Sequence, residues 1–223
     1  MEVGPKGVIE AYPHRNKESR GFFISFEGTE SSGKTTQAKQ LRDWLESQGF
    51  SVILTREPGG TPLGEEIRSF LLDHSNGEIC PLTEAYLFAA ARAQLVMTII
   101  RPALEAGTTV ICDRYIDSSL AYQGYGLGVS LATIWKVNEP AIDLAMPDLT
   151  FLLGSGALLQ SAMKKEPEDR IEARDSGFHQ RVRAGYVRLM KRFPQRIVWV
   201  DTRRGVAPTA CDIQRKVAGL INL

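Results

Sequence analysis

The feature that most constrains the fold of this chain is a glycine-rich loop at residues 28–35, which fits the pattern G-x-x-x-x-G-K-[ST]. The apolar run at 22–26 before it is typical of a buried strand. The segment at 34–48 after it is typical of an amphipathic helix, with one apolar stripe made of Ala38, Leu41, Trp44 and Leu45. A loop between a strand and a helix start presents backbone N–H groups and a positive helix dipole to an anion. The sequence therefore predicts a loop that binds the phosphates of a nucleotide.

Two side chains of this loop carry further chemistry. Lys34 is expected to reach the β- and γ-phosphates, and the Thr35 hydroxyl is expected to ligate Mg²⁺ beside them. The residues predicted to bind the nucleotide are Gly28, Thr29, Glu30, Ser31, Ser32, Gly33, Lys34, Thr35 and Thr36.

Strand-like and helix-like patterns alternate along the whole chain. Short apolar runs occupy 22–26, 51–54, 109–112, 149–153 and 197–200, and helical patterns occupy 34–48, 63–73, 83–105, 131–144, 177–192 and 208–221. This alternation predicts a three-layer α/β/α phosphate-loop NTPase fold with a five-stranded parallel sheet. The 223 residues suffice for one substantial core, expected as a single domain over 21–223, behind a polar, flexible tail at 1–20.

Composition excludes several classes of protein. The net charge of +1 gives no reason to expect binding to nucleic acid or to a membrane surface. Apolar runs stay short of the roughly 20 residues of a transmembrane helix, and residues 1–20 lack the apolar core of a signal peptide. Cys80, Cys112 and Cys211 are widely spaced, which favours reduced thiols over disulfides or a zinc site. We therefore expect a cytoplasmic protein.

Charged residues follow two further strands directly. In a parallel sheet, ligands bind at the carboxyl ends of the strands. Arg56 and Arg114 follow neighbouring strands there, so they are expected to meet a second anionic group, although surface charge is the alternative. Asp113 ends an apolar strand and is a candidate Mg²⁺-associated carboxylate, with a turn or capping aspartate as the alternative.

The helical pattern at 83–105 is apolar nearly all round, which predicts that it is covered on both sides, one of them by a subunit partner. Pro102 is expected to kink or end its last turn. Phe88 and Arg92 are four residues apart and share a face. A base could therefore stack on the ring while the guanidinium bonds its edge, although a core role is the alternative for Phe88.

The charged, proline-containing segment at 164–170 interrupts the helical pattern. We expect an exposed, mobile excursion there and a short lid at about 160–176. Phosphoryl transfer usually needs a cation on the transferring group, and the variable loop positions 29–32 supply none. Arg170 is the candidate for that cation, with a charged helix surface as the alternative reading of the arginines that follow it.

Taken together, these segments closely resemble the bacterial thymidylate kinases, which are phosphate-loop nucleoside monophosphate kinases. The resemblance runs from about residue 21 to the C-terminus. The motifs that carry it lie at 26–36, 56–61, 88–92, 113–124 and 169–172.

The resemblance implies a role for each matching position. Phe88 would stack on thymine, Arg92 would bond its edge, and Ser119 and Gln123 would lie beside the base. Tyr122 would lie against the deoxyribose. The remaining matches are Arg56 and Arg114 on the acceptor phosphate, Glu30 near that phosphate and the 3′-OH, and Arg170 as the lid arginine. The family is homodimeric through the long apolar helix.

The implied reaction transfers the γ-phosphoryl group of ATP to dTMP, giving dTDP. The acceptor phosphate has a second pKa of about 6, so it needs little help from a general base. Catalysis would rest on positioning and charge neutralisation by Lys34, Mg²⁺, Arg114 and Arg170, with Glu30 nearby. The chain departs from the family pattern at Ser31, at 153–156 and at 164–165.

Two alternatives stay open at this point. One is a kinase for another nucleoside monophosphate or for a deoxynucleoside. The other is a nucleotide-binding protein with little turnover. A switch GTPase is disfavoured because the sequence contains no N-K-x-D motif.

Overall fold

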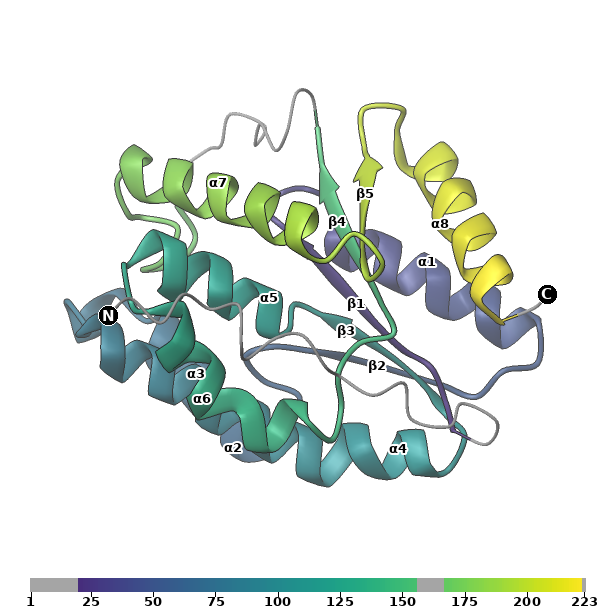
Figure 1. Ribbon diagram of the computed structural model, residues 1–223, viewed down its shortest axis with the longest axis horizontal. Coiled ribbons are helices and arrows are strands. Elements are labelled where there is room, and N and C mark those ends of the chain that lie inside the picture. The colour runs from purple at the N-terminus through teal and green to yellow at the C-terminus, as the bar shows by residue number, and fades with distance from the viewer. Residues whose placement is uncertain (1–19, 156–166, 222–223) are drawn as a thin grey trace.

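The computed structural model describes residues 20–155 and 167–221, and its centre is a twisted parallel sheet (Figure 1). The strand order is β2-β3-β1-β4-β5, and every neighbouring pair is parallel. The strands are β1 (Phe23–Gly28), β2 (Val52–Arg56), β3 (Thr109–Asp113), β4 (Leu149–Gly154) and β5 (Ile197–Asp201). The predicted five-stranded parallel sheet is confirmed, with β1 at its centre.

Helices cover both faces of this sheet (Figure 1). On one face, α1 (Lys34–Ser47) and α8 (Val206–Ile221) pack over β1, β3, β4 and β5. The predicted stripe on α1 is confirmed, because Ala38, Leu41 and Leu45 are buried and Trp44 packs against them. The alternation of strands and helices in the sequence thus predicted the fold class correctly.

The other face carries the larger core. It is covered by α3 (Pro81–Leu95), α6 (Leu131–Ile142) and α7 (Ser176–Arg192), and α2 (Pro62–Leu72) packs on α3. These helices agree with the predicted ranges to within two residues, apart from the long helix discussed next.

The long helix predicted at 83–105 is divided into three parts. It runs as α3, then as a π-helical turn η3 (Val96–Ile100), and then as α4 (Arg101–Glu105). Pro102 does not end the helix, because the chain stays helical to Glu105. Instead, the backbone hydrogen bonding changes to the π-helical pattern. The Arg101 N–H, just before the proline, donates to the carbonyl oxygen of Val96, five residues earlier.

Sequence analysis missed the elements between β3 and α6. Here α5 (Ile116–Ser119) leads into a second π-helical segment, η4 (Leu120–Gly126). A short 3₁₀ turn elsewhere in the chain, η2 (His74–Asn76) after α2, was missed as well. Most side chains of α5 and η4 are buried, both apolar and polar ones. An element buried on all sides shows no alternation of apolar and polar residues, so periodicity could not reveal it.

Parts of the predicted tail and lid fall outside the described residues. These are residues 1–19 of the tail and residues 160–166 of the predicted lid, which include Lys164 and Lys165.

Candidate active site

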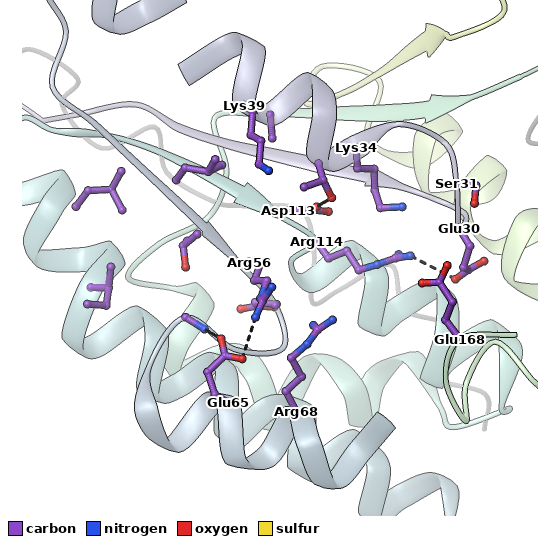
Figure 2. A pocket seen from close by; sticks show the side chains of 18 of the residues that line it. Glu30, Ser31, Lys34, Lys39, Arg56, Glu65, Arg68, Asp113, Arg114 and Glu168 are labelled. Carbon is purple, nitrogen blue, oxygen red and sulfur yellow. Dashed lines mark hydrogen bonds and ion pairs between the residues drawn. The ribbon is translucent and has the colours of Figure 1, made fainter. Parts of the chain in front are cut away.

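The ends of three adjacent strands, β2, β3 and β1, lie side by side at the carboxyl edge of the sheet. Asp113 at the end of β3 lies in register with Arg56 of β2 on one side and with Phe26 of β1 on the other. These strand ends border a cavity of about 790 Å³. Glu57 and Glu172 line it, together with the charged side chains labelled in Figure 2, namely Glu30, Lys34, Lys39, Arg56, Glu65, Arg68, Asp113, Arg114 and Glu168. Predicted residues from three separate motifs are therefore brought together.

The glycine-rich loop closes around the side chain of Lys34. Its Nζ donates to the Thr29 carbonyl oxygen at 2.7 Å, and the side chain is almost fully buried. Burial, with the Arg114 guanidinium adding to it, lowers the pKa of Lys34 to about 7. Ser31 has a φ of 56° in this loop, in the left-handed region that favours glycine. The departure from the family pattern at this position therefore puts a side chain where the backbone prefers none.

The two predicted metal residues are in direct contact. The Thr35 hydroxyl donates a hydrogen bond to the Asp113 carboxylate across the start of α1 and the end of β3. Within residues 20–155 and 167–221, no three His, Cys, Asp or Glu side chains form a group that could hold a metal ion. A hydroxyl and one carboxylate are hard oxygen ligands, which suit a Mg²⁺ ion that takes its other ligands from phosphates and water. The donor set thus fits the predicted ion.

Arg114 reaches across the loop towards Glu30. Its Nη1 donates to the Gly28 carbonyl oxygen at 3.0 Å, and its Nη2 lies 3.3 Å from Glu30 Oε1. Tyr122 donates to the same Glu30 oxygen, and its ring lies 5.1 Å from the Arg114 guanidinium. Burial acts to raise the pKa of Glu30, but Arg114 and the Tyr122 hydroxyl outweigh it and hold that pKa below its ordinary value. These three predicted residues form one cluster.

Arg56 and Arg68 complete the cationic wall of the cavity. Arg56 is 54% exposed and pairs with Glu65 at 3.0 Å. Arg68 donates from Nη1 to the Pro58 carbonyl oxygen at 3.0 Å. Sequence analysis missed Arg68. Its place two turns into α2, just after the motif at 56–61, was the signal that could have found it.

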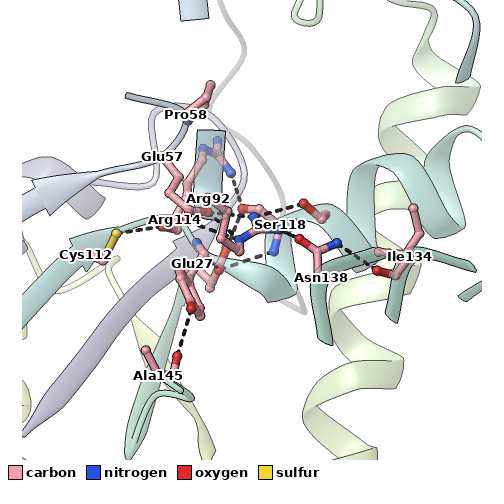
Figure 3. Close-up of polar contacts among 12 residues, drawn as sticks. Glu27, Glu57, Pro58, Arg92, Cys112, Arg114, Ser118, Ile134, Asn138 and Ala145 are labelled. Atoms are coloured by element: carbon pink, nitrogen blue, oxygen red, sulfur yellow. Dashed lines mark hydrogen bonds and ion pairs between the residues drawn. The ribbon is translucent and has the colours of Figure 1, made fainter. Parts of the chain in front are cut away.

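Arg92 is fully enclosed rather than open to the cavity. Its Nε and Nη2 donate to both oxygens of Glu57, at 2.6–3.2 Å, while Nη2 also donates to Ser119 at 3.0 Å and Nη1 to Asn138 at 2.5 Å (Figure 3). Counted over the described part of the chain, these contacts occupy four of the five guanidinium N–H groups, since Nε contributes one, Nη2 two and Nη1 one. One N–H on Nη1 is left for a ligand. Phe88, one helical turn away, is half-buried.

Buried carboxylates that the motifs did not single out support these groups. Glu27 accepts a hydrogen bond from Ser118 Oγ at 2.5 Å (Figure 3) and another from the Tyr186 hydroxyl at 3.0 Å, and both hydroxyls contact Arg114. Burial raises the pKa of Glu27 to about 7, and burial likewise raises the pKa of Glu57 to about 7. Sequence analysis missed both. Each is an acidic residue next to a glycine or proline of a quoted motif, and that position was the available signal.

Arg170 does not line the cavity in this structure. It pairs with Glu84 at 2.7 Å and donates from Nε to the Leu71 carbonyl oxygen at 2.9 Å. Gln123 contacts the same carboxylate, with Nε2 at 3.1 Å from Glu84 Oε1. The structure therefore groups Arg170 with Gln123 and away from Lys34.

A glycine-rich phosphate loop on the central strand, a Thr–Asp pair beside it and a second group of arginines across one cavity define a phosphate-loop kinase. The sequence profile of the thymidylate kinase family matches residues 26–213. The chain belongs to this family, and its enzyme class is that of an ATP-dependent nucleoside monophosphate kinase. The predictions of family, fold and enzyme class are thereby confirmed.

Individual relatives agree with the profile. Over 188 residues, the chain is 47% identical to the thymidylate kinase of an Exiguobacterium species, covering 83% of this chain and 89% of the relative. It is 49% identical over 188 residues to that of Pelotomaculum thermopropionicum, covering 83% and 87%. Its fold is similar to the crystal structure of thymidylate kinase from Ehrlichia chaffeensis, with a TM-score of 0.74, 34% identity, and coverage of 89% and 98%.

Proposed function

We propose that this enzyme transfers the γ-phosphoryl group of ATP to dTMP, giving ADP and dTDP. The observation that carries the proposal is the placing of two groups of cations on one cavity. Lys34 follows the loop for the donor phosphates, Arg56 ends β2, and Arg114 directly follows β3, the strand that neighbours β2. Donor and acceptor phosphates bound to these groups would lie side by side, as in-line transfer requires.

The chemistry follows from charge. An oxygen of the dTMP phosphate attacks the γ-phosphorus, and the bond from that phosphorus to the bridging oxygen of ADP breaks. Lys34 and Arg114 neutralise the negative charge that spreads over the transferring group. Thr35 and Asp113 would hold Mg²⁺, which supplies further neutralisation of the phosphates when it is bound. Glu30 would accept a hydrogen bond from the 3′-OH of the acceptor.

Recognition of thymine would use the enclosed end of the site. The free N–H on Nη1 of Arg92 would donate to a carbonyl oxygen of the base, which would stack on Phe88. Ser119 holds Arg92 in place, and the Gln123 amide would lie beside the base. Tyr122, fixed by Glu30, would lie where a ribose 2′-OH would project.

Arg170 keeps its proposed role at the transferring phosphate on one condition. It would have to leave the ion pair with Glu84, in which its side chain is only 10% exposed. Arg114 and Arg68 already line the cavity and offer cations without any such rearrangement.

We further propose that the enzyme is a cytoplasmic homodimer. An apolar stripe made of Leu82, Tyr86, Ala90 and Met97 is exposed along α3 and η3. The helix Pro81–Glu105 is long and apolar enough to cross a membrane, a property that core helices of soluble proteins share. A second copy packed on the stripe would complete its burial, and light scattering in solution tests this arrangement.

The experiment that tests the reaction is ADP formation with Mg-ATP and a panel of dTMP, dUMP, dCMP, UMP, AMP and GMP. We expect strong turnover with dTMP and weaker turnover with the others. Preferential turnover of another monophosphate would overturn the assignment of the base-binding residues, while binding of dTMP without ADP formation would overturn the proposed catalysis.

A further inference from the structure

Glu84 is a buried carboxylate that none of the proposed steps uses. It lies on the first turn of α3 with no exposed surface. Its Oε1 accepts from Gln123 Nε2 at 3.1 Å and from Arg174 Nη1 at 3.2 Å. Its Oε2 accepts from Arg170 Nη2 at 2.7 Å and from Arg174 Nη2 at 2.6 Å. Two guanidinium groups and one amide therefore converge on a single carboxylate.

The position of Glu84 ties this cluster to the proposed base pocket. Glu84, Phe88 and Arg92 recur at every fourth residue, so they share one face of α3. Two side-chain contacts join this face to the facing segment of α5 and η4. Arg92 bonds Ser119 at 3.0 Å, and Glu84 bonds Gln123 at 3.1 Å. Phe88 lies between these two contacts, and a base stacked on its ring would have Gln123 at its edge.

The carboxylate decides which end of the Gln123 amide faces the base. A carboxylate only accepts hydrogen bonds, so the amide NH₂ of Gln123 must point at Glu84 and the carbonyl oxygen must point away from it. Burial acts to raise the pKa of Glu84, but the hydrogen bond and charge of Arg174, with hydrogen bonds from Arg170 and Gln123, hold that pKa below its ordinary value. Glu84 therefore stays ionised. Gln123 Oε1 accepts no hydrogen bond from any residue in the described part of the chain.

We propose that Glu84 is a positioning residue that fixes Gln123 Oε1 as an acceptor in the base pocket. An acceptor there selects a pyrimidine that carries an N–H at position 3, as thymine does, over one with a bare nitrogen there, as cytosine has. Arg92 supplies the complementary donor for the oxygen at position 4. The inference rests on the proposed base pocket and adds a residue that does not itself touch the substrate.

The test compares two substrates that differ only in this pattern, dTMP and 5-methyl-dCMP. Both keep the 5-methyl group, but the second has an unprotonated N3 and an amino group at position 4. In the Glu84→Gln variant, the new amide both donates and accepts, so Gln123 is free to turn. We expect the ratio of kcat/KM for dTMP over 5-methyl-dCMP to fall roughly 10-fold. The turned Gln123 amide can donate to the unprotonated N3 of 5-methyl-dCMP, which relieves one mismatched hydrogen bond. The change is expected mainly in KM.

Arg174→Met is the matched control. It removes one guanidinium and its contact with the Phe178 ring at 4.7 Å, but it leaves Glu84 paired with Arg170. We expect this variant to keep the wild-type preference even where its denaturation midpoint falls. The double variant Glu84→Gln with Arg174→Met carries less unpaired buried charge, so it serves if the single variant folds poorly, and it should lose the preference as well.

Three results would count against the inference. Glu84→Gln with the wild-type preference for dTMP would overturn it, and so would an equal loss of preference in Arg174→Met, which would indicate general loosening. Wild-type enzyme that turns over both substrates alike would instead overturn the proposed base pocket, and the inference with it.

Discussion

The phosphate end and the proposed base end of the site hold their cations in different ways. At the phosphate end, Lys34, Arg56, Arg68 and Arg114 line a cavity, and the one ion pair of Arg56 is about half exposed. At the base end, the Arg92–Glu57 pair is almost fully buried, with side chains 1% and 3% exposed. Lys34 and Arg114 are themselves largely buried, but a phosphate brings charge with it, so a cation such as Arg56 can stay exposed to solvent until the phosphate binds. A neutral base brings none, so its arginine needs a protein carboxylate as partner.

This contrast implies that the two ends fail differently when they are altered. Loss of a cation at the phosphate end should cost catalysis and leave the fold intact. Loss of a charge at the base end should cost stability first.

The largest effect is expected for Lys34→Met. Removing a cation from the transferring phosphate should lower kcat by roughly 10²–10³-fold, as loss of a preorganised charge does in other enzymes. The pKa of about 7 means that the charged ammonium group destabilises the folded protein. The denaturation midpoint of the variant should therefore be unchanged or higher. Steady-state kinetics and urea denaturation check both parts. A variant with a clearly lower midpoint would contradict the assignment of Lys34 to catalysis alone.

Glu57→Gln and Glu65→Gln apply the same change to the two ends. Glu57→Gln leaves the buried Arg92 without its carboxylate and should lower the free energy of unfolding by roughly 3 kcal/mol. Glu65 pairs with the half-exposed Arg56, so Glu65→Gln should cost at most about 1 kcal/mol. Urea denaturation of the two variants side by side gives the comparison. Equal losses of unfolding free energy in the two variants would contradict the distinction between the phosphate end and the base end.

The smallest effect concerns pH. Because Lys34 has a pKa of about 7 in the empty site and a bound phosphate raises it, ATP binding at pH 8 should take up close to one proton. The affinity for ATP should therefore fall as the pH rises above 7. Titration calorimetry in two buffers of different ionisation enthalpy measures the uptake. The Lys34→Arg variant, which stays charged, should abolish the uptake, and the same uptake in that variant would rule out Lys34 as its source.

The same contrast explains how much the sequence could predict. The phosphate loop, Arg56, Asp113 and Arg114 follow strands directly, so strand patterns and one motif were enough to group them. The partners of Arg92 lie 35 and 46 residues away at Glu57 and Asn138, and only the packing of α3 against α6 and the β2 end brings them together. Local patterns carry no signal for such pairs.

The segment that carries Arg170 shows the same limit. Its composition predicted an exposed excursion and a short lid. Arg170 was the candidate cation because the phosphate loop supplies none, and the resemblance implied the same role. The structure pairs Arg170 with Glu84, a residue 86 positions earlier, and Glu84 looks in the sequence like an ordinary helix N-terminal acid. Residue spacing in the sequence could not predict a buried ion pair between two such distant segments.

The central proposal is that one end of the site recognises the charge of the phosphate and the other end recognises the base. The most direct test measures kcat/KM for dTMP and dCMP in the Arg56→Met variant and in the Arg92→Met, Glu57→Gln double variant, which leaves no charge of that pair unpaired. The account predicts that Arg56→Met lowers both values by the same factor and that the double variant lowers the value for dTMP alone, so that the preference disappears. Equal changes in preference for both variants would contradict it.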